Sequence, residues 1–340
     1  MDGGRDWACL VTGATGLVGN NVVRLLVESG AAVRVLVHPG SPSVDRALAG
    51  LPVERVEARL DHDEDLARAV DGSAVIVHAA IRAHAAPRRL AAMREAHVDG
   101  TRRVVRAARR AGARLVHVSS ADALGLRPDG APADEDTLPG SSSDDAVVIA
   151  RREAEIEVLR AVDRGLHAVI VNPVVMLGPW DWEPSSARML LEVAAGRGLL
   201  APPGTNEFVD VRDVAAGILA AVDRGRAGRR YILGGHRLSY REAWTLFARV
   251  TGRRPPLATA PAALVRAAGW CGDVAGMFQP RGAALDSAAA RLAIAARTFS
   301  GRRAEHELGY AIRPLEQTVR DAWRWFVTRG YAAPVRRRAA

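Results

Sequence analysis

Three glycines near the N-terminus have the spacing of a phosphate-binding loop. Gly13, Gly16 and Gly19 follow a short apolar run and precede a stretch with apolar residues at helical spacing. In that context the first glycine permits a tight turn, the second lets the backbone approach a pyrophosphate, and the third lets the helix pack closely on the sheet. The helix N-terminus adds free N–H groups and a partial positive charge. The pattern predicts dinucleotide binding, with these contact residues: Gly13, Thr15, Gly16, Leu17 and Val18.

The residues after the next apolar run bear on the choice between the two nicotinamide dinucleotides. An acid at that place hydrogen-bonds the ribose 2′-hydroxyl of NAD and repels the 2′-phosphate of NADP. Residues 37–41 read Val-His-Pro-Gly-Ser and contain no acid. His38, Ser41 and Ser43 could accept a phosphate, so we expect NADPH, with NADH as the alternative. The same residues could instead form a turn that does not contact the cofactor.

Short β-branched runs alternate with longer helical patterns throughout the first half of the chain. Strands connected by crossover helices of this kind form a doubly wound parallel sheet. We therefore predict a Rossmann-type α/β fold. The predicted strands are 7–11, 32–37, 53–57, 74–78, 115–118 and 167–172, and the predicted helices are 17–28, 63–70, 88–111 and 147–164.

After residue 173 this alternation breaks down, and proline-rich segments separate helices predicted at 185–196 and 240–251. The short run 208–213, with a helix to 223, could rejoin the first domain. We expect a dinucleotide-binding domain of residues 1–172 plus about 207–227, a smaller and mostly helical substrate-binding domain of about 173–206 and 228–330, and a basic tail of 331–340. Five side chains could line an apolar pocket or belong to the core: Met176, Trp180, Trp182, Met189 and Phe208.

The basic charge of the chain comes from one residue type. All 47 basic residues are Arg, against 38 acids, which gives a net charge of +9 over 340 residues. Because these arginines are scattered over many predicted helices, we expect no nucleic-acid partner.

The longest apolar-leaning stretch, 258–278, contains Arg266 and Asp273 and is too short and too charged to span a bilayer. With a polar start at residues 1–6, this predicts a cytoplasmic protein without a membrane partner. Two cysteines far apart in the sequence, Cys9 and Cys271, indicate neither a disulfide framework nor a metal site.

Beyond the glycine loop, several short segments form a recognisable set. They are 78–80 (His-Ala-Ala), 98–101 (Val-Asp-Gly-Thr), 118–120 (Val-Ser-Ser) with 123–125 (Ala-Leu-Gly), 172–173 (Asn-Pro) with 178–179 (Gly-Pro), 211–215 (Val-Arg-Asp-Val-Ala) and 230–235 (Arg-Tyr-Ile-Leu-Gly-Gly). Over nearly its whole length the chain thereby resembles the extended short-chain dehydrogenase/reductase family of NAD-dependent epimerases and dehydratases. The subgroup it is most similar to contains hopanoid-associated sugar epimerases and dihydroflavonol-reductase-like proteins.

That resemblance implies a small-molecule substrate and several further contacts with the cofactor. The implied cofactor contacts are Leu60, Ala79, Ala80, Ser119, Arg151 and Pro173. It also implies that Ser120 is the catalytic serine of the family. A homodimer is possible by the same resemblance, through the helices that flank Arg102 and Val158.

The chain departs from this family at the two residues on which the family's chemistry depends. The family combines its Ser with a Y-x-x-x-K pattern, in which the Tyr moves a proton while the Lys lowers the Tyr pKa and holds the ribose. Counting back from residues 172–173, the pattern falls on Val147 and Arg151. A change of register cannot restore it, because the first Tyr in the chain is Tyr231 and there is no Lys. Only Ser120 remains of the proton-handling set.

Ser120 and Arg151 are therefore the candidate catalytic residues. Arg151 has five donors that could hold the ribose hydroxyls, but a guanidinium with a pKa above ~12 cannot relay protons. It could equally be a surface residue at a helix start, and Ser120 could be a satisfied hydroxyl at a strand end. Three histidines could replace the missing acid, although packing or surface roles also explain each of them: His84, His97 and His117.

Loss of the Tyr and Lys restricts the chemistry. Oxidising an unactivated alcohol requires a base, and general acid–base help is worth roughly 10²–10⁴ in rate. Reducing a carbonyl that has its own hydrogen-bond donor, such as the phenol of an aromatic polyketide, requires mainly hydride positioning and one donor. The sequence thus predicts an atypical NAD(P)H-dependent ketoreductase of a bulky metabolite. The alternatives are a nucleotide-sugar epimerase or dehydratase with a relocated base, and a non-catalytic dinucleotide-sensing protein.

Overall fold

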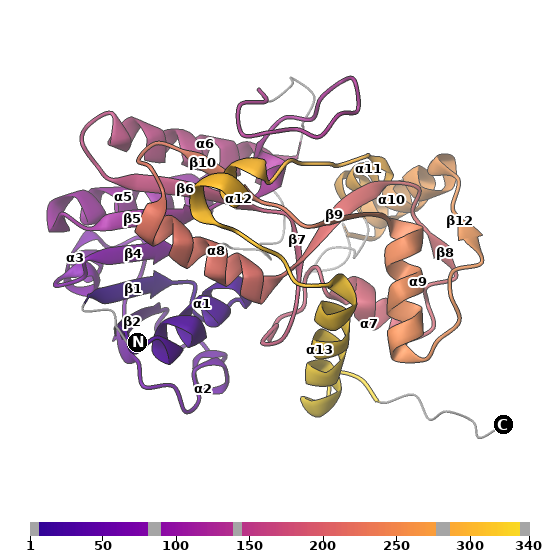
Figure 1. The fold of residues 1–340 in the computed structure, drawn as a ribbon, viewed down its shortest axis with the longest axis horizontal. Helices are drawn as coiled ribbons and strands as arrows, with labels where there is room; N and C mark the ends of the chain where they lie inside the picture. Colours follow the sequence, from indigo (N-terminus) through magenta and orange to yellow (C-terminus); the bar gives the residue numbers. More distant parts are fainter. Residues whose placement is uncertain (1–6, 81–89, 139–144, 277–285, 334–340) are drawn as a thin grey trace.

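Seven parallel strands form the central sheet, in the order β10-β6-β5-β4-β1-β2-β3 (Figure 1). The computed structural model describes residues 7–80, 90–138, 145–276 and 286–333. The strands are β1 (Ala8–Thr12), β2 (Ala32–Val37), β3 (Glu54–Glu57), β4 (Val75–His78), β5 (Arg114–Val118), β6 (Ala168–Pro173) and β10 (Arg230–Leu233). Six of them lie within one residue of the predicted bounds. The predicted doubly wound α/β fold is confirmed.

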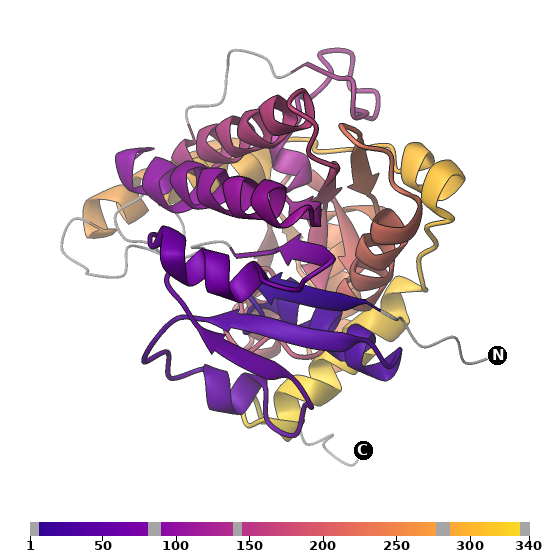
Figure 2. The same cartoon turned by 90° about the vertical axis from the view of Figure 1, so that its left-hand side faces the viewer.

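Helices cover both faces of this sheet (Figures 1 and 2). They are α1 (Leu17–Glu28), α2 (Val44–Ala47), α3 (Asp63–Val70), α5 (Gly100–Ala111), α6 (Ala146–Val162), α8 (Val211–Arg224) and α12 (Arg302–Leu308). Alternate residues of β1 divide between two apolar cores, because side chains along a strand point to opposite faces. Cys9 and Val11 pack with α1 and α8, whereas Leu10 packs with α3, α5 and α6. The parallel strands end together at one edge, and the candidate site lies there.

The helix predicted at 88–111 is divided into three parts. It consists of α4 (Leu90–Arg94), a π-helical segment (Glu95–Asp99) and α5, and its predicted first two residues lie outside the described part of the chain. A π-helical segment inserts one residue into the helical repeat and often lies at a functional site. Here it places His97 in the interior, with 6% of its surface exposed. Hydrophobic spacing alone does not predict this local change of helical repeat.

The seventh strand of the sheet comes from a segment that we expected in the second domain. Residues 230–233 pair with β6 in parallel, with Ile232 beside Asn172. After them, α12 packs on α8 and on β10. Strand β10 and helix α12 therefore belong to the Rossmann domain, and the assignment of 228–330 to the second domain is wrong for these two segments.

The second lobe contains more β-structure than we expected. Strands β7 (Val175–Leu177), β9 (Thr205–Asp210) and β11 (His236–Ser239) form a three-stranded sheet, and β8 (Leu200–Ala201) pairs with β12 (Ala258–Thr259). Its helices are α7 (Arg188–Ala194), α9 (Tyr240–Thr251), α10 (Ala262–Gly276), α11 (Ser287–Ile294) and α13 (Leu315–Thr328). No helix in the described ranges is long and apolar enough to cross a membrane.

Aromatic side chains form the core of this lobe. Phe208 is fully buried, and its ring lies 6.2 Å from those of Tyr240 and Phe247. Trp182 is 5% exposed and meets the Trp325 ring edge-on at 5.0 Å. These contacts favour core packing over a pocket lining for Phe208 and Trp182. Trp180, Met176 and Met189 are partly buried against the same or the neighbouring core.

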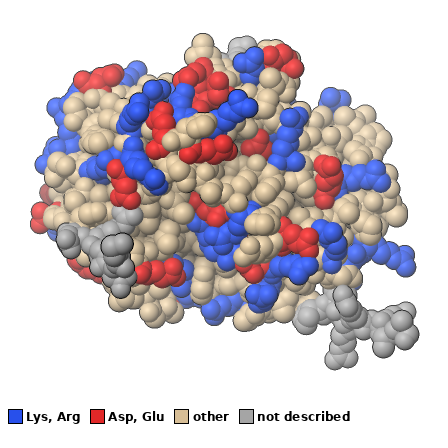
Figure 3. Space-filling view, viewed as in Figure 1, with Lys and Arg blue, Asp and Glu red and all other residues tan. Residues whose placement is uncertain are grey.

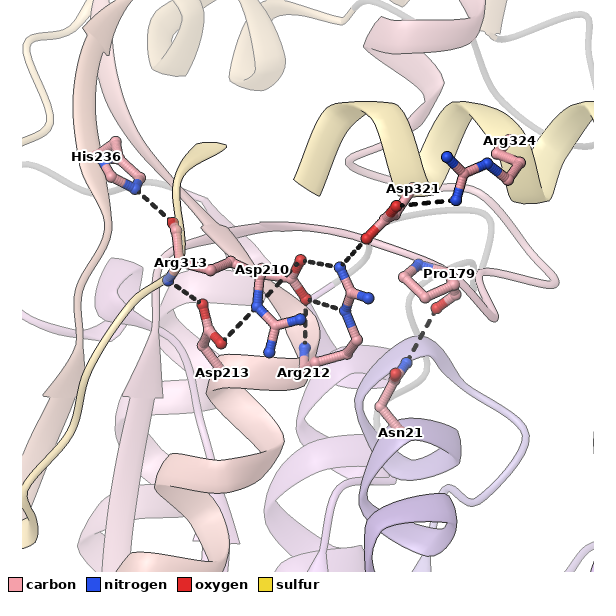
Figure 4. Close-up of polar contacts among 9 residues, drawn as sticks. All are labelled: Asn21, Pro179, Asp210, Arg212, Asp213, His236, Arg313, Asp321 and Arg324. Atoms are coloured by element: carbon pink, nitrogen blue, oxygen red, sulfur yellow. Dashed lines mark hydrogen bonds and ion pairs between the residues drawn. The ribbon is translucent and has the colours of Figure 1, made fainter. Parts of the chain in front are cut away.

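A network of arginines and carboxylates joins the start of α8 to the C-terminal segment (Figure 4). Asp210 caps α8 by accepting from the Arg212 amide at 2.8 Å, and its two oxygens also accept from the Arg212 guanidinium at 2.9 and 2.7 Å. Arg212 donates to Asp321 of α13 at 2.8 Å, and Arg313 donates to Asp213 at 2.8 Å. Asp210 is only 1% exposed, and these cations compensate its burial. The network fixes α13 against the Rossmann helix α8.

One buried carboxylate has no such compensation. Asp181, 1% exposed, lies between Trp180 and Trp182 in the loop after β7, and its Oδ2 atom has no hydrogen-bond partner. Burial, and to a lesser degree Glu183, raises its pKa from 3.8 to about 7. The ionised form of Asp181 is therefore unfavourable in the folded chain.

We expect Asp181→Asn to stabilise the protein more at pH 8 than at pH 5. The folded-state pKa of about 7 exceeds the unfolded value of 3.8, so the parent protein loses stability as the pH rises through this window. At ~1.4 kcal/mol per pKa unit, the free energy of unfolding of the parent protein falls by up to about 4 kcal/mol above pH 7. Urea denaturation at both pH values measures the difference between variant and parent. An equal difference at pH 5 and pH 8 would contradict the assignment.

Candidate functional site

The glycine loop, the end of β4 and the start of α1 are in close backbone contact. Gly13 has a left-handed φ of 72°, and a Cβ atom there would lie 2.5 Å from the Ala79 carbonyl oxygen. A Cβ atom on Gly19 would lie 2.2 Å from the Gly13 carbonyl oxygen. At Gly16, by contrast, the single neighbour within 4 Å is the Gly13 oxygen at 3.4 Å. Two glycines thus allow the chain to pack, and the third leaves open space for an approaching group.

The first turn of α1 suits a pyrophosphate. Gly16 is the N-cap, no side chain caps the helix, and the first turn contains no acid. Its amide groups and the positive end of the helix dipole are therefore free for an anion. Thr12 supports the loop, since its Oγ1 accepts from the Ala80 amide at 3.3 Å and bonds His78 Nδ1 at 2.7 Å. The residues present fit a dinucleotide.

The structure brings most of the predicted cofactor residues to one edge of the sheet. Gly13, Thr15, Gly16, Leu17 and Val18 form the loop and first turn, Ala79 and Ala80 follow β4, Ser119 follows β5, and Pro173 ends β6. Leu60 follows β3 and is partly buried. His38 follows β2, is exposed, and bonds the Pro39 oxygen at 2.8 Å through Nδ1. Contact of these residues with the cofactor stays a prediction.

Ser120 lies at the carboxyl end of β5 with a hydroxyl hydrogen free to be donated. It caps a short 3₁₀ turn (Ala121–Ala123), where its Oγ accepts from the Asp122 amide at 3.3 Å. Asn172 Nδ2 donates to the Ser120 carbonyl oxygen at 3.0 Å and to Glu155 Oε1 at 2.7 Å. Arg230 donates to the other Glu155 oxygen at 2.7 Å. This chain of bonds from α6, β6 and β10 holds the backbone of Ser120 in place.

Arg151 and a second arginine share the carboxylate of Asp122. Arg151 lies on α6 with Nη1 4.0 Å from Asp122 Oδ2, and its Nε atom is buried without a partner. Arg297, only 8% exposed, forms an ion pair with Asp122 Oδ1. Burial lowers the pKa of Arg297 to about 10 and also lowers the pKa of Arg151. Asp122, two residues after Ser120, thus lies between two cations, and the carboxylates of Asp145 and Glu155 also act on Arg151. We call Asp122, Arg151 and Arg297 the Asp122 cluster.

No pattern in the sequence indicates a role for Arg297. It lies in an irregular segment outside the family motifs identified above. Its backbone amide donates to the Thr205 carbonyl oxygen at 2.9 Å. The surface alternative for Arg151 is not supported, because its side chain is 20% exposed.

No tyrosine has moved in to replace the missing one. Val147 packs in an apolar cluster with Met93, Val98 and Ala150. The four tyrosine hydroxyls all bond elsewhere, to these groups: Tyr231 to Glu307 at 2.8 Å, Tyr240 to Asn206 at 3.1 Å, Tyr310 to the Gly234 oxygen at 2.9 Å and Tyr331 to the Trp182 oxygen at 2.7 Å. The site therefore has no phenol as a proton donor.

The buried histidines are poor replacements as acids. Burial lowers the pKa of His78 and of His97 to about 4 and that of His117 well below its usual value, and Arg151 lowers that of His97 further. All three are neutral at pH 7, so none of them is an imidazolium that could donate a proton. His97 Nε2 and His117 Nδ1 nonetheless have no hydrogen-bond partner. His84 lies outside the described residues.

We expect Asp122→Asn to destabilise the protein by about 3 kcal/mol, because it leaves the buried guanidinium group of Arg297 without its carboxylate. In the double variant Asp122→Asn/Arg297→Met, that charge is removed together with its partner. The double variant should therefore recover part of the lost stability. Urea denaturation of the four proteins in this cycle measures the coupling. Additive losses would show that the ion pair is not coupled.

Comparison with known proteins identifies the family. The chain matches the NAD dependent epimerase/dehydratase family over residues 9–234 and belongs to it. Sterol demethylase protein B of Methylococcus capsulatus is 33% identical over 329 residues, covering 94% of this chain and 98% of that protein. A 4-hydroxy-2-methyl-3-oxo-4-farnesyl-3,4-dihydroquinoline-1-oxide ketoreductase of Stigmatella aurantiaca is 30% identical, covering 92% and 95%. A nucleoside-diphosphate-sugar epimerase from Pseudomonas aeruginosa has a similar structure, with a TM-score of 0.81, 25% identity and coverage of 96% and 99%. The resemblance to extended short-chain reductases is confirmed.

Proposed function

We propose that this member of the NAD-dependent epimerase/dehydratase family is an NADPH-dependent ketoreductase of a bulky, lipophilic molecule. The observation that carries the proposal is the Asp122 cluster beside Ser120, with Val147 where the family has its tyrosine. The bound dinucleotide supplies the hydride. The protein's own groups then have two tasks, which are to position the carbonyl and to stabilise the negative charge that develops on its oxygen.

Fixed cations and a hydroxyl suit this charge. Hydride addition turns a carbonyl into an alkoxide, and preorganised donors stabilise such an oxyanion most in a water-poor site. Ser120 has one free O–H donor, and Arg151 has a buried Nε–H without a partner. Oxidation of an alcohol would instead require a base near neutral pKa. The histidines have pKa values of about 4 or below their usual range, so they are weak bases.

The proton that completes the reduction then comes from water, because a substrate hydroxyl that gave up its own proton would be left as an alkoxide. A hydroxyl beside the ketone can donate a hydrogen bond to the developing alkoxide from within the substrate. The Stigmatella relative supports this idea, because the substrate in its name has a 4-hydroxy group next to a 3-oxo group. Its farnesyl chain and the sterol named for the Methylococcus relative support a lipophilic substrate class.

The test is NADPH oxidation with polycyclic aromatic ketones. We expect turnover with ketones that have a neighbouring hydroxyl and much slower turnover with the same ketones after O-methylation. The rate should change little between pH 5 and pH 8, because the site histidines, with pKa values of about 4, do not titrate there. Ser120→Ala should lower kcat/KM by about 10²-fold while the Kd for NADPH stays unchanged.

Three results would count against this proposal. An inflection near pH 6.5 would indicate a working histidine acid. Turnover of a nucleotide sugar that is abolished by His97→Gln would favour an epimerase or dehydratase with a relocated base. Tight NADPH binding without turnover of any ketone would favour a dinucleotide sensor.

The preference for NADPH depends on the end of β2, and one substitution tests it. His38 is exposed there, and the hydroxyls of Ser41 and Ser43 lie 3.2 Å apart. We expect His38→Asp to weaken NADPH binding by at least tenfold, since the new carboxylate repels a 2′-phosphate, and to leave NADH binding equal or tighter. Fluorescence titration with both cofactors gives the two Kd values, and His38→Asn is the uncharged control. Equal losses for both cofactors would refute a 2′-phosphate site.

A further inference from the structure

Strands β8 and β12 and helix α10 lie at the end of the second lobe farthest from the Rossmann sheet (Figure 1), and five exposed apolar side chains belong to this region. They come from β8, the β12 region and α10, and we call them the apolar end: Leu199, Leu200, Leu257, Leu264 and Trp270. Leu257 is 73% exposed and Trp270 66%. Monomeric soluble proteins expose single apolar residues routinely, but a continuous group of them marks an interaction surface.

The backbone makes these residues neighbours. Leu200 pairs with Ala258 in the β8–β12 ladder, and the Leu257 amide donates to the Leu199 carbonyl oxygen at 2.9 Å. The next elements continue directly, since Ala260 donates to the Ala201 oxygen at 2.8 Å before α10 begins. Leu264 lies in the first turn of α10, the helix that follows this small sheet, and Trp270 lies in the middle of the same helix.

Within the described residues, helix α10 packs mainly on α11. Val265 and Gly269 are buried, and a Cβ atom on Gly269 would lie 2.6 Å from Ala290 Cβ, so this side packs on α11. Two of the exposed side chains of α10 are charged, Arg266 and Asp273, and the others are apolar: Ala263, Leu264, Ala267, Ala268, Trp270, Cys271 and Ala275. A helix in water normally presents polar residues to solvent. The exposed side of α10 is thus built to contact something apolar.

The charges around the apolar end are mostly positive. Arg254 is exposed three residues before Leu257, Arg266 is exposed on α10, and neither has an ion pair within the described ranges. Of the nearby acids, Glu192 pairs with Arg197, whereas Asp273 accepts hydrogen bonds from the neutral amide and hydroxyl of Ser287 and keeps its negative charge. In Figure 3 the end of the molecule with β8 and β12 is mostly uncharged, with isolated basic groups. An occupant that is apolar inside and anionic at its surface would match both features.

We propose that the apolar end docks on the surface of an anionic lipid bilayer. Trp and Leu side chains on a short helix enter the boundary between headgroups and acyl chains, while neighbouring arginines meet anionic headgroups. The helix lies on the membrane, since none in the described ranges can span it. We expected no membrane partner because the sequence has no spanning segment, and surface docking does not require one. The benefit to the reaction rests on the proposed function, because a lipophilic ketone is concentrated in the bilayer.

Co-sedimentation with lipid vesicles tests this proposal independently of catalysis. The full chain should bind vesicles of phosphatidylcholine mixed with phosphatidylglycerol, and bind pure phosphatidylcholine vesicles at least tenfold more weakly. Each surface arginine contributes about 1 kcal/mol, so Arg254→Glu/Arg266→Glu should weaken binding to the mixed vesicles by more than about thirtyfold. Leu264→Ser/Trp270→Ser should weaken it by at least tenfold.

The matched control is Leu138→Ser, which removes an 84% exposed leucine from a different part of the surface and should bind like the parent. Turnover of a water-soluble ketone should be unchanged in the α10 variants, which separates this proposal from the ketoreductase activity. Equal binding of parent and α10 variants, or no binding to the mixed vesicles, would overturn the proposal. A parent dimer that Trp270→Ser dissociates in sedimentation equilibrium would also overturn it, in favour of a second copy of the chain.

Discussion

The site depends on one backbone contact at the carboxyl end of β1. The Gly13 position lies so close to the Ala79 carbonyl, and the Gly19 position to the Gly13 carbonyl, that no side chain fits at either glycine. The end of β4, the glycine loop and the start of α1 can therefore pack together. In this arrangement the first amide groups of α1 face open space at the carboxyl edge of the sheet. Because β1 and β5 both pair with β4, the same contact also determines where Ser120 lies relative to that helix. Loop residues and catalytic residues thus share one rigid frame.

Within that frame, the electrostatics differ from those of a proton relay. A tyrosine with a lowered pKa can exchange a proton, whereas the guanidinium groups of Arg151 and Arg297 keep theirs, with a pKa of about 10 even for the buried Arg297. Asp122 lies between these charges, and Asp145 and Glu155 add negative charge near Arg151. The buried histidines add no charge at neutral pH, since desolvation holds them neutral. Such a site can stabilise an anion but cannot easily create one by removing a proton.

Local patterns in the sequence predicted the features that have local causes. Apolar runs and helical spacing predicted six strands and the main helices, and the glycine spacing predicted the loop. The π-helical segment at His97 arises from packing, so it has no periodic signature. β10 was assigned to the wrong lobe because it pairs with β6, a strand far away in the sequence, and local patterns do not show such pairing. Arg297 was missed for the same reason, since only the folded chain brings this irregular segment to Asp122.

The joint loss of Tyr and Lys is consistent with one change of chemistry. In the family's scheme the Lys serves the Tyr, because it lowers the pKa of that phenol. Here Val147 stands in the position of the Tyr and packs against Met93. A Lys at position 151 would therefore have no phenol whose pKa it could lower. Arginine at 151 keeps a positive charge and directional donors, and its pairing with Asp122 orients it. A fixed cation in place of a titrating pair favours substrates whose own hydroxyl stabilises the developing alkoxide by a hydrogen bond, as in an α-hydroxy ketone, while water supplies the proton.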